Sequence, residues 1–428
     1  MSYKEVINNR LDGVQELLSK DITKYALMYM FLIITSGVSF VNYFTVTKVI
    51  KYIFLAILPI ILFLVMKKNT QISKNIKDIN IFFIFICVFS SLSIIWSQSR
   101  GITTKNTLFL IATTVIAMYM GLNYTKEEIF KMLLQWFIIL VVINLVSWIF
   151  SLPFVFDTTE MRYTHFPIKG IFKHRNLLAF YMVLTITLSL WFLMNNKDDK
   201  KLKLTYLGTI IGAAIILMGT KSMTCYLLLP VFIILILITK YKTLNNIIIY
   251  AILPLLLFST YAMVCQPAWF QNLLLAIGRT PTLTDRSVIW NGVVACIKVK
   301  PMLGYGYTGL FSNNIYAVNF IAEFYGGLPS HCHNGYLDIL IDFGFVGAVF
   351  IVAGFTFLFN RIKKLNNSKT LKDKRYVSYI LSFLVFIAFY NLIESPIIKH
   401  CSTIYVLIII FSNVIQKEWD KEHNREES

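Results

Sequence analysis

The chain has 428 residues, of which 57% are hydrophobic and 14% are charged, and its mean hydropathy is +0.66. A soluble protein of this size would need far more polar surface, so the composition predicts an integral membrane protein. The formal net charge is +18, but the basic residues stand in short connections between apolar runs rather than on one face of a domain. We interpret them as topology signals and as contacts to anionic headgroups of membrane lipids, which excludes a nucleic acid as a partner.

Neither the first residues nor the cysteines change this class. Residues 1–24 are polar and place no apolar core before a cleavage site, so no cleavable signal peptide is expected. The six cysteines show no CxxC or other metal-binding spacing, and we interpret them as small apolar residues. A disulfide among Cys265, Cys296 and Cys332 is the alternative.

Apolar runs long enough to cross a bilayer recur along the chain. A helical span needs roughly 17–25 apolar residues, and by this rule we count about twelve spans. They lie near residues 25–43, 48–66, 79–96, 105–122, 128–151, 176–194, 203–219, 223–239, 245–263, 334–359, 376–394 and 400–416. Because the runs lack the alternating pattern of membrane strands, the predicted fold is an all-α polytopic membrane protein.

Lysine and arginine set the expected orientation of these spans. The connections around residues 67–77, 197–203, 240–242 and 361–375, together with both termini, carry roughly 26 of the 40 basic residues. The basic-rich side of a membrane protein faces the cytoplasm. The sequence therefore predicts cytoplasmic termini.

The longest interruption between apolar runs divides the chain into three predicted parts. Residues 1–263 hold spans one to nine, residues 264–333 form a long outer loop, and residues 334–428 hold the last three spans and a cytoplasmic tail. Within the outer loop, Asp285 to Lys300 has the pattern of an amphipathic helix, and Pro301 follows its end. Such a helix is expected to lie at the membrane surface, packed on the bundle.

Three glycines further along this loop, Gly304, Gly306 and Gly309, match the pattern GxGxxG. No buried strand precedes them, so we do not interpret them as a dinucleotide site. We expect a tight turn that presses the backbone onto the bundle.

Two histidines stand at the mouth of the tenth predicted span. A neutral imidazole at His331 or His333 is suited to accept a proton from a hydroxyl near pH 7. The alternative is that both are interfacial polar residues at a helix start, with Asn334 as the N-cap. A zinc site needs three or four convergent ligands, and the His-x-His pattern supplies two at best, so no metal is expected.

Ionisable residues continue into and around this span. Asn334, Asp338 and Asp342 recur every four residues and form one polar stripe on an otherwise apolar helix. We expect the aspartates to face a cavity or to pair with a basic residue. The outer-side cations nearest to span ends are the side chains that could hold a pyrophosphate, or that could instead reach lipid phosphates: Arg286, Lys221 and Arg175.

Several short segments between Gly170 and Gly347 complete the pattern. They are Gly170-Ile171-Phe172-Lys173-His174-Arg175-Asn176, Thr220-Lys221-Ser222, Arg286 through Trp290, Pro301-Met302-Leu303-Gly304-Tyr305-Gly306, His333-Asn334-Gly335-Tyr336-Leu337 and Asp342-Phe343-Gly344-Phe345-Val346-Gly347. In this order, with the twelve-span layout and the long loop after the ninth span, they resemble the bacterial O-antigen ligase and polymerase superfamily. The resemblance is to Wzy-type polysaccharide polymerases of the succinoglycan-polymerase kind.

The resemblance implies a membrane-embedded glycosyltransferase of the GT-C type. Its donor would be a glycan on undecaprenyl pyrophosphate at the outer face of the bacterial inner membrane, with no cofactor, metal ion or nucleotide sugar. The residue matching His333 would activate the acceptor hydroxyl, and those matching Lys221 and Arg286 would bind the pyrophosphate. Ligases usually carry Arg at the position of Lys221, whereas Lys is common there among polymerases, which favours a polymerase.

The predicted site follows from both lines of reasoning. The predicted catalytic residues are His333, Asp338 and Asp342. The aspartates are candidates for a carboxylate nucleophile in a double displacement, although we favour their orienting His333 or pairing with arginine. The predicted contacts to pyrophosphate or glycan are Arg286, Lys221, Arg175, His331, Asn334, Trp290 and Tyr305.

Three functions stay open. The first is a polymerase that joins lipid-linked repeat units into O-antigen, capsular or exopolysaccharide, with donor and acceptor both on undecaprenyl pyrophosphate and a chain-length regulator protein as a candidate partner. The second is an O-antigen ligase that moves the finished glycan to the lipid A core. The third is a polysaccharide transporter or flippase, which would explain the spans but not the long outer loop with His333.

Overall fold

The computed structural model describes residues 3–39, 44–68, 78–158, 166–195, 199–239, 241–276, 283, 286–312, 331–371, 373–395 and 397–426. The helices are α1 (Tyr3–Ser19), α2 (Asp21–Thr35), α4 (Thr45–Lys68), α6 (Asp78–Leu92), α7 (Arg100–Asn123), α8 (Lys126–Ile149), α9 (Arg175–Asn195), α10 (Lys200–Thr220), α11 (Met223–Ile238), α12 (Lys242–Cys265), α13 (Ala268–Ala276), α14 (Arg286–Val299), α16 (Gly335–Asn367), α17 (Arg375–Tyr390) and α18 (Thr403–Glu426), with short turns η1 (Pro153–Val155) and η2 (Leu310–Ser312). Only isolated β-bridges accompany them in these ranges. The predicted all-α class is confirmed.

Each of the predicted spans overlaps one helix of the structure. Seven helices are long and apolar enough to cross a membrane, namely α4, α7, α8, α9, α10, α12 and α16. Residues 80–92 of α6, together with α11 and α17, are shorter apolar helices. The protein is therefore a multi-pass membrane protein. The count of twelve crossings stays a prediction.

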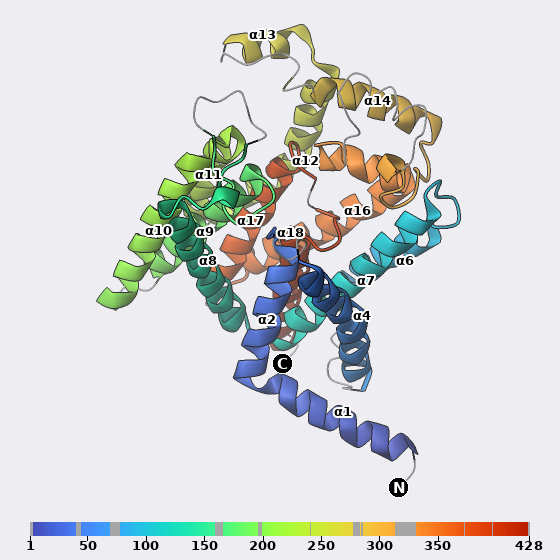
Figure 1. The fold of residues 1–428 in the computed structure, drawn as a ribbon, viewed down its shortest axis with the longest axis vertical. Helices are drawn as coiled ribbons and strands as arrows, with labels where there is room; N and C mark the ends of the chain where they lie inside the picture. Colours follow the sequence, from blue (N-terminus) through green and yellow to red (C-terminus); the bar gives the residue numbers. More distant parts are fainter. Residues whose placement is uncertain are drawn as a thin grey trace.

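The last helix, α18, forms the centre of the bundle (Figure 1). Every residue from Thr403 to Gln416 is buried, and the helix contacts α2, α6, α7, α16 and α17. A helix that is apolar on all sides belongs inside a protein or a membrane. By contrast, α12 exposes large apolar side chains such as Leu253 and Leu257, as expected of a helix that faces lipid.

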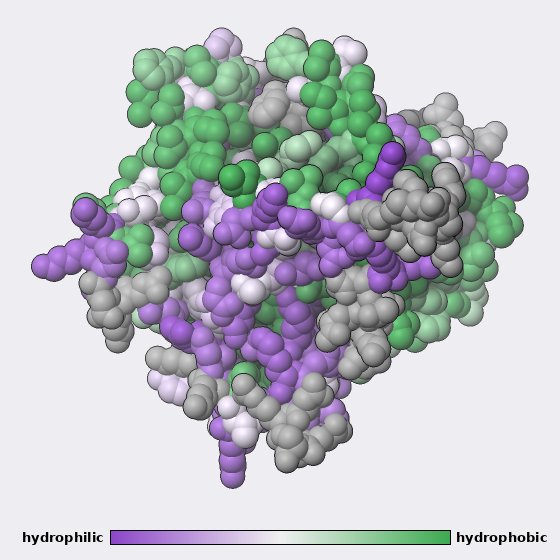
Figure 2. Space-filling view, turned by 90° about the horizontal axis from the view of Figure 1, so that it is seen from below, coloured by the Kyte–Doolittle hydropathy of each residue, from purple (hydrophilic) through white to green (hydrophobic). Residues whose placement is uncertain are grey.

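Figure 1 draws both ends of the chain toward its lower side, and Figure 2 views the molecule from that side. Hydrophilic side chains gather over the middle of this face, whereas hydrophobic ones lie toward its edges. This distribution is typical of a bundle with apolar flanks and a polar end. The cytoplasmic placement of this end stays a prediction.

The helix predicted from Asp285 to Lys300 is present as α14, although its predicted first residue, Asp285, lies outside the described residues. Its place on the outer side of the membrane stays a prediction. Ile289, Val293 and Cys296 are buried on one side, and the helix contacts α12 and α16. Figure 1 shows α13 and α14 lying across one end of the molecule. The disulfide alternative is wrong, because all six cysteines are free.

A glycine turn fixes this outer part to α16. Gly304 has φ +66°, and a Cβ added there would lie 2.4 Å from the carbonyl oxygen of Ile341. Gly344, inside α16, has φ 63° and ψ −169°, and its added Cβ would lie 2.2 Å from the carbonyl oxygen of Met302. The predicted close approach of the glycine turn to the bundle is confirmed, and Gly344 breaks α16 into two helical pieces.

We expect Gly344→Ala to lower the free energy of unfolding by at least about 2 kcal/mol, because this backbone conformation is open almost only to glycine. Thermal unfolding in detergent measures the loss. The matched control is Gly208→Ala in α10, where an added Cβ meets nothing within 4 Å. An equal effect of the two substitutions would contradict the backbone explanation.

Candidate active site

The turn that carries the two histidines is held from both sides. The N–H of Cys332 donates to Oδ1 of Asp338 at 2.9 Å. The carbonyl of Cys332 accepts a hydrogen bond from Nε1 of Trp290 in α14 at 3.0 Å. His333 follows with a left-handed φ of 52°. The Asn334 side chain accepts from the backbone N–H groups of the next turn, so its predicted N-cap role is confirmed.

The two imidazoles lie against each other. The backbone N–H of His333 donates to Nδ1 of His331 at 3.1 Å, and the ring centroids are 4.1 Å apart. Because Nδ1 of His331 accepts this bond, its ring is neutral and holds its proton on Nε2. His331 thus helps to fix the backbone of His333.

Glu394, which the sequence analysis did not single out, is the carboxylate beside His333. Its Oε2 lies 3.9 Å from Nδ1 of His333. Its Oε1 accepts a hydrogen bond from Nδ2 of Asn176 at 3.1 Å and lies 3.7 Å from Nη2 of Arg286. At 3.9 Å the contact to His333 is an ion-pair distance rather than a hydrogen bond, and such contacts often tighten when substrate binds.

The segment that begins α9 is joined to the connection between α10 and α11. Nη1 of Arg175 donates to the carbonyl of Lys221 at 3.0 Å, and Lys221 ends α10 with φ 52°. Oγ of Ser222 donates to Oδ1 of Asn176 at 3.0 Å. Through Asn176 and Glu394, segments distant in sequence reach Arg286 and His333.

Burial lowers the pKa of His333 to about 4. The Glu394 carboxylate opposes this shift, whereas the charges of Arg286, His174 and Lys399 add to it. The pKa of His331 falls to about 2, again chiefly through burial and then through Lys399. About 26% of the His333 side chain remains exposed, so at neutral pH it is an accessible, uncharged base.

A cavity of about 680 Å³ is lined by His331, His333, Glu394 and residues from α2, α4, α7, α9 and the segment before α18. The three predicted pyrophosphate contacts, Arg286, Lys221 and Arg175, are not among its lining residues. Asp338 and Asp342 instead line a neighbouring cavity of about 270 Å³. The two cavities share five lining residues, Asn106, His331, Ser395, Lys399 and His400. The carboxylate that shares the larger cavity with His333 is therefore Glu394.

Trp290 and Tyr305, the two aromatic residues among the predicted substrate contacts, are buried. The hydroxyl of Tyr305 donates to the carbonyl of Cys296 at 3.1 Å, and Lys300 lies over its ring. Both aromatic residues pack between α14 and the start of α16. Their roles as substrate contacts stay predictions.

His331, His333 and Glu394 could also hold a metal ion, since one ligand atom from each lies within 4.8 Å of the others. Three ligands and one open position are what a catalytic zinc requires. In this arrangement, however, Nδ1 of His331 already accepts the backbone N–H of His333. The same three side chains therefore fit a base and its supporting groups as well as a metal.

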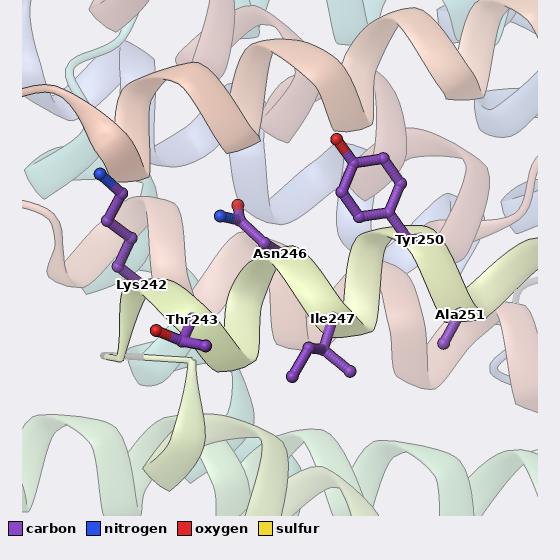
Figure 3. Close-up of a pocket in the computed structure, with 6 residues that line it drawn as sticks. All are labelled: Lys242, Thr243, Asn246, Ile247, Tyr250 and Ala251. Atoms are coloured by element: carbon purple, nitrogen blue, oxygen red, sulfur yellow. The ribbon is translucent and has the colours of Figure 1, made fainter.

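A further hollow lies along α12 and is lined by Lys242, Thr243, Asn246, Ile247, Tyr250 and Ala251 (Figure 3). The hydroxyl of Tyr250 accepts a hydrogen bond from Nζ of Lys363 in α16. Neither a histidine nor a carboxylate is among these lining residues. We therefore place the active site in the cavity around His333.

Comparison with known proteins identifies a family domain within the chain. Residues 207–352 match the family described as O-Antigen ligase. A Rickettsia felis protein named "Putative polysaccharide ligase" is 28% identical over 160 residues, which are 36% of this chain and 38% of that protein. "Exopolysaccharide production protein ExoQ" of Rhizobium meliloti is 29% identical over 94 residues, 21% of this chain and 22% of that protein.

The chain thus carries an O-antigen ligase family domain, and the predicted resemblance to the O-antigen ligase and polymerase superfamily is confirmed. The match covers residues 207–352 of a chain of 428 residues, so it identifies this domain and not the activity of the whole protein. The curated relatives are matched over less than two fifths of their length. Lys221, Arg286 and His333 lie inside the family match, whereas Arg175 and Glu394 lie outside it.

Two substitutions should move the protonation midpoint of His333 in opposite directions. Glu394→Gln removes the charge that raises the pKa of His333 and should lower the midpoint, whereas Arg286→Gln removes a cation and should raise it. Mass spectrometry of histidine C2–H exchange against pH measures both. The control is Glu128→Gln, which removes a carboxylate paired with Lys24 and should leave the midpoint unchanged. Equal shifts would contradict the arrangement around Glu394.

Proposed function

We propose that the protein polymerises undecaprenyl-pyrophosphate-linked oligosaccharide repeat units at the outer face of the bacterial inner membrane. In this proposal it is a GT-C glycosyltransferase with cytoplasmic termini, and its product is O-antigen, capsular or exopolysaccharide. The observation that carries the proposal is an uncharged His333 at a cavity, with Glu394 on one side and Arg286 beside it. The family domain and the relatives named for polysaccharide ligation and production support the substrate class.

The reaction needs little from the protein, because pyrophosphate is already a good leaving group. His333 takes the proton of the acceptor hydroxyl as its oxygen attacks the anomeric carbon of the donor. The bond from that carbon to the pyrophosphate oxygen breaks, and the lipid pyrophosphate departs with the electron pair. Glu394 then stabilises the imidazolium, and direct displacement inverts the anomeric centre.

Cations near His333 stabilise the charge that develops on the departing pyrophosphate. The guanidinium of Arg286 lies 3.7 Å from the Glu394 carboxylate, and its charge acts on His333. We assign Lys221 and Arg175 to the same task from the α9–α10 side. In this mechanism the chain uses no metal ion and no nucleotide sugar.

Asp338 acts through the backbone rather than on the substrate. Its carboxylate accepts the N–H of Cys332, one residue before His333, so we assign it as a positioning residue. Asp342 lies one helical turn further and lines the smaller cavity. A double displacement would require a carboxylate nucleophile, and among the described residues Glu394 is the carboxylate within 4 Å of His333. Its contacts to Asn176 and Arg286 favour an orienting role instead.

His333→Ala should lower turnover of purified lipid-linked glycan by about 100-fold or more, because a general base contributes roughly 10²–10⁴-fold to such a reaction. The rate of polymer formation in detergent or nanodiscs measures this loss. His423→Ala, at the exposed end of α18, is the matched control and should keep the full rate.

Wild-type rates from His333→Ala would overturn the assignment of the base. Loss of activity in a chelator, restored by zinc, would instead assign His331, His333 and Glu394 to a metal site. Both results can be obtained with the same purified protein and assay.

The second candidate is an O-antigen ligase, which the description of the matched family favours. The two functions differ in what accumulates when the protein is deleted from its own bacterium. A lost polymerase leaves surface glycan of a single repeat unit, whereas a lost ligase leaves finished glycan stranded on its lipid carrier. A gel of surface and lipid-linked glycans separates them, and repeat units facing the cytoplasm would point to a transporter.

A further inference from the structure

The cavity that contains His333 carries more positive charge than one pyrophosphate site requires. Its lining includes four lysines, Lys51 of α4, Lys105 of α7, Lys173 before α9 and Lys399 before α18, which we call the lysine chamber. Glu394 is the only carboxylate among the described lining residues. Three of these lysines come from segments other than those of Arg286, Lys221 and Arg175, and Lys173 stands two residues before Arg175.

The lysines are close enough to one another to interact unfavourably. The pKa of Lys173 is lowered by burial and then by the charges of Lys51 and Lys399. Within the described part of the chain, no carboxylate lies within 4 Å of Lys105, Lys173 or Lys399. Like charges gathered at a cavity attract an anion, which relieves their repulsion.

Aromatic rings line the same cavity. Tyr52 and Phe109 stack with centroids 5.8 Å apart and planes at 5°, and Phe109 also lies 6.0 Å from the ring of His400. Phe180, Tyr181 and Tyr390 also line the cavity. Aromatic rings beside a few polar groups are suited to bind a sugar ring, whereas a pyrophosphate has no apolar face to pack against them.

We propose that the lysine chamber binds a negatively charged sugar of the glycan, so that this enzyme acts on an acidic polysaccharide. This inference rests on the proposed function and narrows its substrate. Lysine is a flexible point charge, whereas the arginine fork is better matched to phosphate. The division of labour is then Arg286 for the pyrophosphate and the lysine chamber for the sugar. The cavity of about 680 Å³ is within the usual range for a ligand of a few rings.

The test uses the full chain in nanodiscs and two probes of equal size, cellobiouronic acid and cellobiose. We expect the acidic disaccharide to bind about tenfold more tightly, and this preference to shrink in high salt. Lys105→Gln and Lys399→Gln should each weaken its binding by about tenfold, the size of one charge-assisted hydrogen bond. Lys242→Gln, in the hollow along α12, is the matched control and should bind like the unchanged protein.

Equal affinity for the two disaccharides, including no measurable affinity for either, would overturn the inference. So would inorganic pyrophosphate competing for the site that depends on Lys105 and Lys399, because the chamber would then hold the lipid carrier. His333→Ala should keep the preference for the acidic disaccharide while losing transfer. A normal transfer rate in that variant would contradict the proposed function alone.

Discussion

The arrangement of the active site depends on the Glu394 carboxylate. It lies just beyond α17 and reaches Asn176 of α9, Arg286 of α14 and His333 before α16. Only about 19% of its side chain is exposed, so its charge depends on these partners for compensation. Each of these three partners belongs to a different segment of the fold. One partly buried anion therefore joins three segments that are far apart in sequence.

Helix ends, rather than helix sides, supply most of this site. The backbone groups at the start of α16 are satisfied by Asn334 and by the carbonyl of Asn391, which accepts the N–H of Gly335 at 2.8 Å. A Cβ at Gly335 would lie 2.0 Å from Oδ1 of Asn391, so only glycine allows this approach. Because α16 begins directly against the end of α17, His333 and Glu394 are brought to one place. The backbone groups that have no partner within a helix terminus thus make the contacts that position the site.

Hydropathy was sufficient to place the apolar helices, periodicity predicted α14, and the glycines predicted the turn of Gly304, since each depends on local composition or backbone conformation. The helices α1 and α13 were not predicted. Hydropathy could not identify Glu394, because this residue ends the eleventh apolar run, where a charged residue at the membrane interface is ordinary. The available signal was an ionisable residue at the end of a predicted span. Lys51 and Lys105 lie inside two of the predicted spans and Lys399 lies between two others. A linear pattern does not show that these segments converge. The partner of Asp338 is a backbone N–H, which leaves no trace in a sequence.

The charges around His333 impose opposite demands on the reaction. Cations that attract a pyrophosphate or an acidic sugar also disfavour a proton on the imidazole, so a cavity rich in lysine weakens its own base. Glu394 raises the pKa of His333 and so opposes the effect of the cations there. Its second oxygen, Oε1, faces Arg286 and Asn176, so the lysine chamber stays positively charged. Once the hydroxyl proton has moved to His333, the new positive charge lies beside Glu394 while negative charge develops on the leaving group. A single carboxylate among many cations thus favours the charge distribution of the transition state over that of the empty site.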